Sequence, residues 1–124
     1  MKTVTIFCAL LICLTTSAFA GDDTRDKAYT KIMATNTIRC GYYVWPPYIT
    51  KDPNSGKLGG FLYDMMETIG QSLNLKIDWA SEINFDAMFE GYASGKYDMI
   101  CAPLAATPAR ARASDFTQPF MYAA

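Results

Sequence analysis

The chain has 124 residues, eleven basic and twelve acidic side chains, and a formal charge of −1 at neutral pH. This near balance gives no basis for binding nucleic acid or an anionic membrane surface, because both require a clear excess of lysine and arginine. Histidine is absent, so the commonest metal ligand and proton-transfer group is missing, and we expect neither a metal nor a cofactor.

The first twenty residues have the features of a secretory signal peptide. Lys2 supplies a minimal positive charge, and the apolar run over residues 4–14 is too short to span a bilayer. Residues 18–20 form an A-x-A pattern, at which signal peptidases cut, although an uncleaved signal anchor is the alternative. We therefore expect a signal peptide over residues 1–20, export of the chain, and a mature protein that begins at Gly21.

The mature sequence alternates apolar runs with stretches of helical periodicity. Short apolar runs bounded by turn residues predict strands, and apolar residues at three- and four-residue steps predict amphipathic helices. In chain order we predict a lead-in segment over residues 21–37, strands over 38–44, 75–80 and 97–102, and helices over 60–73 and 85–94. This alternation implies an α/β fold with a parallel sheet and right-handed crossovers. We expect the helices to pack on the sheet through five apolar side chains: Phe61, Met65, Ile69, Met88 and Phe89.

Two of the four cysteines, Cys8 and Cys13, lie in the predicted signal peptide. The other two, Cys40 and Cys101, would remain in an exported protein, where a cysteine pair often forms a disulfide. Both lie in predicted strands that we expect to be parallel neighbours, and bridge geometry across such strands is poor. Buried cysteines also serve as small apolar residues. We therefore favour two free thiols over a disulfide.

Residues 95–120 combine a predicted strand, a loop and the start of a helix. Thr107 is a good N-cap residue and Pro108 suits the first helical position, so Arg110 falls in the first turn. The free N–H groups of a helix start carry a partial positive charge, which makes a cation there unfavourable unless an anion lies beside it. Arg110 is therefore a candidate for anion binding, and the alternative is a local ion pair with Asp115.

Five segments of the mature chain carry a resemblance to a known family in their order and spacing. They are IRCGYYVWPPY (38–48), GKLGGFLYDMMETIG (56–70), SGKYDMI (94–100), TPARAR (107–112) and DFTQPF (115–120). Together they resemble the bacterial extracellular solute-binding proteins of family 3, the amino-acid type of periplasmic binding protein. The resemblance implies a periplasmic-binding-protein-like lobe, in which helices flank a short parallel sheet with the first strand in the middle. Members of the family have two lobes, so we expect residues 38–124 to be the N-terminal part of lobe one, truncated before lobe two.

The resemblance also implies where a ligand would lie. In the family an aromatic side chain after the first strand stacks on the ligand, and Trp45 is the residue at that place; its alternative role is to pack on the prolines that follow it. The family holds the ligand's carboxylate with an arginine, which falls on Arg110, and with a loop in which Leu104 and Ala105 can offer backbone N–H groups. This loop departs from the family pattern, since Ala105 lacks a hydroxyl group and Pro103 lacks an N–H.

The same resemblance implies a function. It is that of the periplasmic substrate-binding component of an ABC-type uptake transporter, which binds a small polar solute such as an amino acid or another small carboxylate. In the full-length form the partner is a membrane permease. The alternatives are the ligand-sensing domain of a signalling receptor and a fragment of an enzyme with the same fold. The sequence shows no nucleophile–base pair and no tuned carboxylate pair, so we expect no enzymatic activity and structural roles for Asp98 and Asp115.

Overall fold

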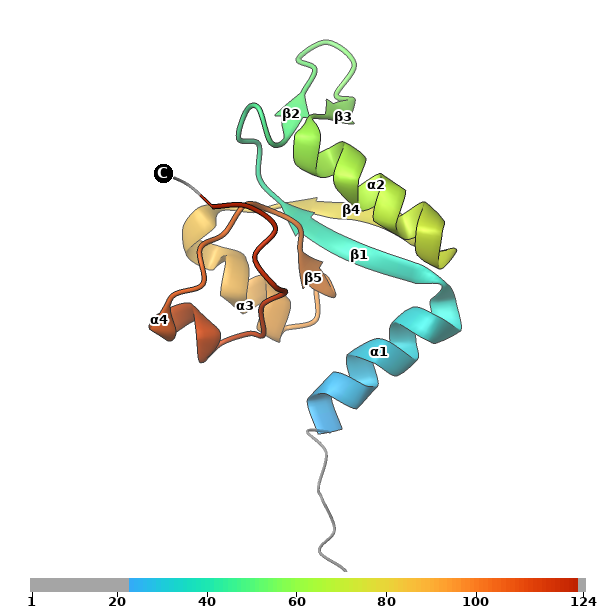
Figure 1. Ribbon diagram of the computed structural model, residues 1–124, viewed down its shortest axis with the longest axis vertical. Coiled ribbons are helices and arrows are strands. Elements are labelled where there is room, and N and C mark those ends of the chain that lie inside the picture. Colours follow the sequence, from blue (N-terminus) through green and yellow to red (C-terminus); the bar gives the residue numbers. More distant parts are fainter. Residues whose placement is uncertain (1–22, 123–124) are drawn as a thin grey trace, which may run out of the picture.

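The computed structural model describes residues 23–122, which form helices on the two faces of a parallel sheet (Figure 1). The elements in chain order are α1 (Asp23–Thr35), β1 (Thr37–Tyr42), β2 (Thr50–Lys51), β3 (Leu58–Gly59), α2 (Phe61–Leu73), β4 (Lys76–Glu82), the 3-10 turn η1 (Phe85–Ala87), α3 (Met88–Ala93), β5 (Met99–Ile100) and α4 (Pro108–Ala111). The predicted signal peptide lies outside the described residues. Within residues 23–122, no helix has the length and apolar character that a membrane span requires.

Three parallel strands form the central sheet in the order β4–β1–β5, so the first strand lies in the middle, as predicted. Ile38 of β1 pairs with Ile77 of β4, and Cys40 of β1 pairs with Met99 of β5. Strand β5 has only two residues, so it is much shorter than the predicted strand over residues 97–102. Strands β2 and β3 form a separate antiparallel hairpin.

The face through which helix α2 packs against the sheet matches the predicted one only in part, because Met65 packs against the buried core, as predicted. Met66 and Gly70 are buried. Phe61 and Ile69, by contrast, are 57% and 39% exposed. Apolar residues occupy more than half of the helix circumference. The sequence therefore allows either the stripe with Phe61 and Ile69 or the stripe with Met66 and Gly70 to face the sheet. Gly70 decides between them, because a Cβ atom there would lie 2.8 Å from the Ile77 side chain, and so close an approach of helix and strand requires a glycine.

Helix α3 covers the opposite face, and the almost fully buried Tyr97 packs between this helix and the sheet. The Tyr97 ring lies against Gly41 of β1, where a Cβ atom would be 2.8 Å from it, and its hydroxyl donates a hydrogen bond to the Met88 carbonyl. Cys40 and Tyr42, on either side of Gly41, belong instead to the buried cluster under α2. Alternate residues of a strand face opposite sides of a sheet. Helices α2 and α3 therefore lie on opposite faces (Figure 1), and Met88 is buried, as predicted.

Helix α1 occupies a segment in which the sequence predicted only a polar lead-in. An ion pair of 3.0 Å between Lys31 Nζ and Asp98 Oδ1 ties this helix to the sheet. Arg39 of β1 contacts the same carboxylate with two nitrogens, Nε at 3.0 Å and Nη2 at 2.7 Å. Burial by itself raises the pKa of Asp98, but hydrogen bonds from Arg39 and Lys31 outweigh this effect and hold the pKa at about 2. Asp98 therefore has a structural role, as expected, and it performs this role as an ion-pair partner of Arg39 and Lys31.

Cys40 and Cys101 form a disulfide, so the prediction of two free thiols is wrong. Their Cα atoms are 5.4 Å apart, which is within the usual range for a bridge. The prediction assumed that both cysteines lie within paired strands, but β5 ends at Ile100. Because Cys40 pairs with Met99, Cys101 is its diagonal neighbour on the same face, just beyond the strand, where the chain can adjust to the bridge.

Candidate functional site

The carboxyl ends of the three parallel strands lie at one edge of the sheet, and ligands of open α/β sheets bind at such edges. The loop after β1 contains Trp45, and the loop after β5 contains Leu104 and Ala105. Arg110 lies in α4, directly after that second loop. The turn η1, which begins at Phe85, follows β4 at the same edge. The fold thus brings the loops that carry the predicted site residues to one edge of the sheet.

Three aromatic rings form a cluster at this edge: Tyr43, Trp45 and Phe85. Tyr43 stacks on Trp45 with ring centroids 5.9 Å apart, and it meets Phe85 edge-on at the same centroid distance of 5.9 Å. Trp45 and Phe85 are each 49% exposed. An exposed aromatic face can pack against an apolar side chain or attract a cation. The cluster therefore offers a platform for the side chain of a small solute.

Arg110 lies beside this aromatic cluster. Its Cζ atom is 5.0 Å from the centroid of the Phe85 ring, and its Nη1 donates a hydrogen bond of 3.0 Å to the Ala105 carbonyl. Thr107 caps α4 and Pro108 is its first residue, as predicted, but this helix has only four residues. Its dipole is correspondingly small. The capacity for anion binding therefore resides in the guanidinium, which has five N–H donors; the bond to Ala105 occupies one of these donors.

In the part of the chain that the structure describes, several backbone donors of the loop between β5 and α4 have no partner. Within the described residues, the N–H groups of Leu104, Ala105 and Ala106 make no hydrogen bond. The Leu104 side chain lines an apolar cavity, so the backbone of Leu104, and not its side chain, is the group available to a polar ligand. Free N–H donors close to an arginine suit the two oxygens of a carboxylate.

The predicted residues are connected through two residues that the sequence did not single out. Tyr43 contacts both Trp45 and the loop after β5, and Phe85 lies under the Arg110 guanidinium. The sequence predicted Phe85 as the first residue of a helix over residues 85–94, whereas it begins a half-exposed turn. A signal for Phe85 was present: the predicted strand over residues 75–80 also ends at the ligand-binding edge, so the loop after it belongs with the other two.

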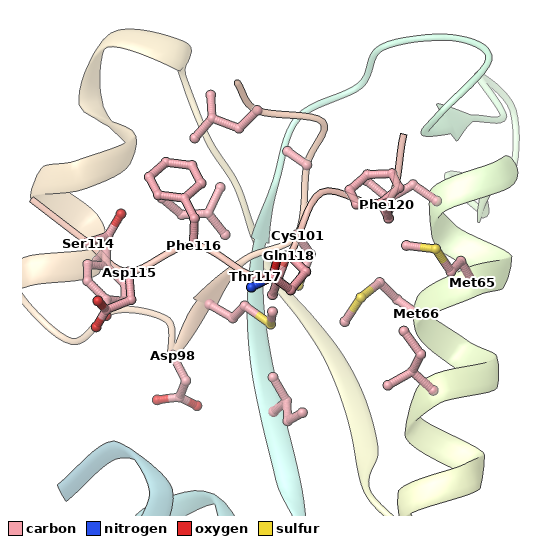
Figure 2. A pocket seen from close by; sticks show the side chains of 18 of the residues that line it. Met65, Met66, Asp98, Cys101, Ser114, Asp115, Phe116, Thr117, Gln118 and Phe120 are labelled. Carbon is pink, nitrogen blue, oxygen red and sulfur yellow. The ribbon is translucent and has the colours of Figure 1, made fainter. Parts of the chain in front are cut away.

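The apolar cavity in Figure 2 is a separate feature with a volume of about 560 Å³. Met66 and Phe120 lie on one side of it and Phe116 lies on the other. Its lining is mostly apolar and includes neither Trp45 nor Arg110. A small polar solute needs convergent polar groups, so we place the candidate site at the strand edge. In the part of the chain that the structure describes, no three acidic or cysteine side chains are grouped to hold a metal ion.

Comparison with known proteins identifies the family. The family model described as "Bacterial extracellular solute-binding proteins, family 3" matches residues 38–124. The chain belongs to this family. The match confirms the resemblance carried by the five sequence segments.

Two curated relatives of this chain are named as binding proteins. Over 120 residues it is 32% identical to a probable histidine-binding protein of Campylobacter jejuni, with 96% of this chain and 46% of the relative covered. Over 127 residues it is 31% identical to a probable amino-acid ABC transporter-binding protein of Haemophilus influenzae, with 98% of this chain and 46% of the relative covered. The chain thus spans slightly less than half the length of these relatives.

A solved structure of an ancestral arginine-binding protein bound to arginine has the same fold. The TM-score is 0.64 and the sequence identity is 33%, and the match covers 69% of this chain and 38% of the solved one. The short parallel sheet with flanking helices is therefore a periplasmic-binding-protein-like lobe, as predicted.

Proposed function

We propose that the chain is the substrate-binding component of an ABC-type uptake transporter and that it binds an amino acid or another small carboxylate. The proposed site is the edge of the sheet at the loops after β1, β4 and β5. The position of Arg110 carries this proposal, because its guanidinium lies over Phe85 and contacts the loop whose N–H groups at residues 104–106 have no partner among residues 23–122. Family membership and the names of the relatives support an amino acid as the ligand. A membrane permease is the corresponding partner of the complete protein.

Each residue of the site has a distinct role in this proposal. Arg110 binds the solute carboxylate through charge-assisted hydrogen bonds, which contribute about 1.5–3 kcal/mol. The N–H groups of Leu104 and Ala105 donate to the same carboxylate. Trp45 packs against the solute side chain, and this contact contributes about 0.5–2 kcal/mol if that side chain is cationic.

We place the protein in the periplasm, since the family is described as extracellular and the N-terminus has the pattern of a signal peptide over residues 1–20. Mass spectrometry of the periplasmic fraction should find a chain that begins at Gly21. A cytoplasmic product that still begins at Met1 would contradict this placement.

The names of the relatives favour binding over catalysis, because both are called binding proteins. The groups at the strand edge also suit binding: a guanidinium, free backbone N–H donors and aromatic faces stabilise a bound solute but supply neither a nucleophile nor a general base. We therefore propose that the solute leaves the site chemically unchanged.

Isothermal titration calorimetry on the complete gene product tests the proposal. The common L-amino acids are titrated one by one, and the carboxamide of each binder serves as the matched control without a carboxylate. We expect at least one amino acid to bind, and we expect its carboxamide to bind at least about tenfold more weakly, since a charge-assisted contact is lost. Failure of every amino acid to bind, or equal binding of acid and amide, would contradict the proposal.

A further inference from the structure

Tyr43 contacts both loops of the proposed site. It is the first residue after β1, and its hydroxyl donates a hydrogen bond of 2.7 Å to the Pro103 carbonyl in the loop after β5. Its ring stacks on Trp45 and meets Phe85 edge-on. Burial raises the pKa of this hydroxyl, although the positive charge of Arg110 acts in the opposite direction. The hydroxyl therefore keeps its proton at neutral pH and remains a hydrogen-bond donor.

The loop over residues 102–106 has few anchors of its own. In the described part of the chain it makes two hydrogen bonds, from Tyr43 to the Pro103 carbonyl and from Arg110 to the Ala105 carbonyl. A bound carboxylate would compete for the Arg110 guanidinium, so the second bond depends on whether the site is filled. The bond from Tyr43 does not have this dependence.

The bond from Tyr43 also fixes the direction of a backbone donor. The peptide unit between Pro103 and Leu104 is trans, so the Pro103 carbonyl and the Leu104 N–H point in opposite directions from one rigid plane. When the carbonyl is held by Tyr43, the Leu104 N–H can point in only one direction. Without that bond the plane could turn about its two flanking single bonds, and the Leu104 N–H would turn with it.

The geometry points to Tyr43 as a positioning residue of the binding site: its hydroxyl holds the loop over residues 102–106 so that the Leu104 and Ala105 N–H groups stay oriented for a carboxylate. This inference rests on the proposed function. Tyr43 itself has no role as a carboxylate donor, because its only hydroxyl proton is committed to Pro103. Its ring additionally supports Trp45, so the two loops are held in one arrangement before a solute arrives.

Nuclear magnetic resonance relaxation of backbone amides tests the inference without any ligand. Tyr43→Phe removes the hydroxyl and keeps the ring, and Tyr63→Phe is the matched control, because Tyr63 stacks on Trp79 and its hydroxyl makes no hydrogen bond within the described residues. In the ligand-free complete gene product, we expect Tyr43→Phe to increase the motion of the Leu104 and Ala105 amides and Tyr63→Phe to leave them unchanged. Unchanged amides in Tyr43→Phe would overturn the inference.

Binding of L-arginine and L-argininamide provides a second readout, which separates positioning from simple loss of packing. If Tyr43 positions carboxylate donors, Tyr43→Phe should weaken L-arginine binding about fivefold, the size of one neutral hydrogen bond, and weaken L-argininamide binding less than about twofold. Equal weakening of both probes would show a purely structural role and overturn the inference. If the wild-type protein does not bind L-arginine, that result bears on the proposed function and not on the role of Tyr43. The relaxation of the Leu104 and Ala105 amides then tests the role of Tyr43.

Discussion

Among single residues, Trp45 combines a place in the aromatic cluster with a face that is open to solvent. It contacts Tyr43 and Tyr48 through its ring and is 49% exposed. Only the buried half of such a side chain stabilises the fold through removal from water. The exposed half is available to a solute, so binding and stability should respond differently to its removal.

Trp45→Ala should weaken the binding of an amino acid with a cationic side chain by about 0.5–2 kcal/mol in the complete gene product, because the stacking surface is lost. The matched control is Phe120→Ala, which removes another half-exposed aromatic ring, 45% exposed, from the cavity of Figure 2. The control should lower stability and leave binding unchanged. Calorimetry and urea unfolding measure both effects. If Trp45→Ala lowered only stability, Trp45 would be a packing residue of its loop.

Asp98 gives a pH dependence whose sign follows from its pKa. The folded pKa of about 2 lies below the ordinary value of 3.8, so the ionised carboxylate stabilises the fold at pH values above about 4. This contribution, roughly 2 kcal/mol, is lost as the pH falls from 4 toward 2. Urea unfolding at pH 5 and pH 2.5 should therefore show Asp98→Asn strongly destabilised at pH 5 and much closer to wild type at pH 2.5. Asp86→Asn, at an exposed position, is the control, and a wild-type advantage that did not shrink would contradict the assignment.

Among the elements, strand β5 is held in the sheet by more than its hydrogen bonds to β1. It has two residues and pairs with β1 at only two positions, yet the loop of the proposed site begins directly after it. The disulfide between Cys40 and Cys101 joins the two strands at this point. The covalent link therefore holds β5 against β1, as the hydrogen bonds of a longer strand pair would do, and it fixes the position at which the loop starts.

The double variant Cys40→Ala with Cys101→Ala should lose about 4 kcal/mol of unfolding free energy, since the bridge closes a segment with a sequence separation of 61 residues. Urea unfolding with and without a reductant measures the loss. Reductant should destabilise the wild-type protein after unfolding and refolding, and it should not affect the double variant. Two free thiols found by alkylation of the native protein would contradict the bridge.

Much of the fold follows from local sequence pattern. The apolar runs locate β1 and β4, and the Thr107-Pro108 pair locates the start of α4. These signals involve neighbouring residues, so they do not depend on contacts with distant parts of the chain. The position of β1 in the middle of the sheet came from the resemblance to a family and not from any local pattern.

The misses share a different physical origin, because each depends on contacts between distant segments. The face of α2 is selected by the fit of Gly70 against Ile77, and an apolar count along the helix does not contain that contact. The disulfide depends on where β5 ends, and Phe85 joins the site only because β4 lies beside β1. The predicted helix over residues 85–94 began at Phe85, whereas Phe85 lies in a 3-10 turn that precedes α3.

At the scale of the whole molecule, the proposed site occupies one edge of one lobe. The chain spans less than half the length of its curated relatives, and Trp45 and Phe85 remain half-exposed. A site that buries most of a small solute needs walls on more than one side. The loops after β1, β4 and β5 provide one such wall, with a cation for the carboxylate and an aromatic platform for the side chain.

Binding measurements on two arginine variants distinguish a ligand-binding role of Arg110 from a structural one. Calorimetry measures the binding of the preferred amino acid by the complete gene product as wild type, Arg110→Ala and Arg112→Ala, the last being an exposed arginine two residues further along the chain. We expect Arg110→Ala to weaken binding at least about tenfold with the fold intact, since a charge-assisted contact contributes about 1.5–3 kcal/mol, and Arg112→Ala to bind like wild type. Unchanged binding in an Arg110→Ala protein that had lost stability would show that Arg110 is a structural partner of Phe85 and Ala105, and that the solute lies elsewhere.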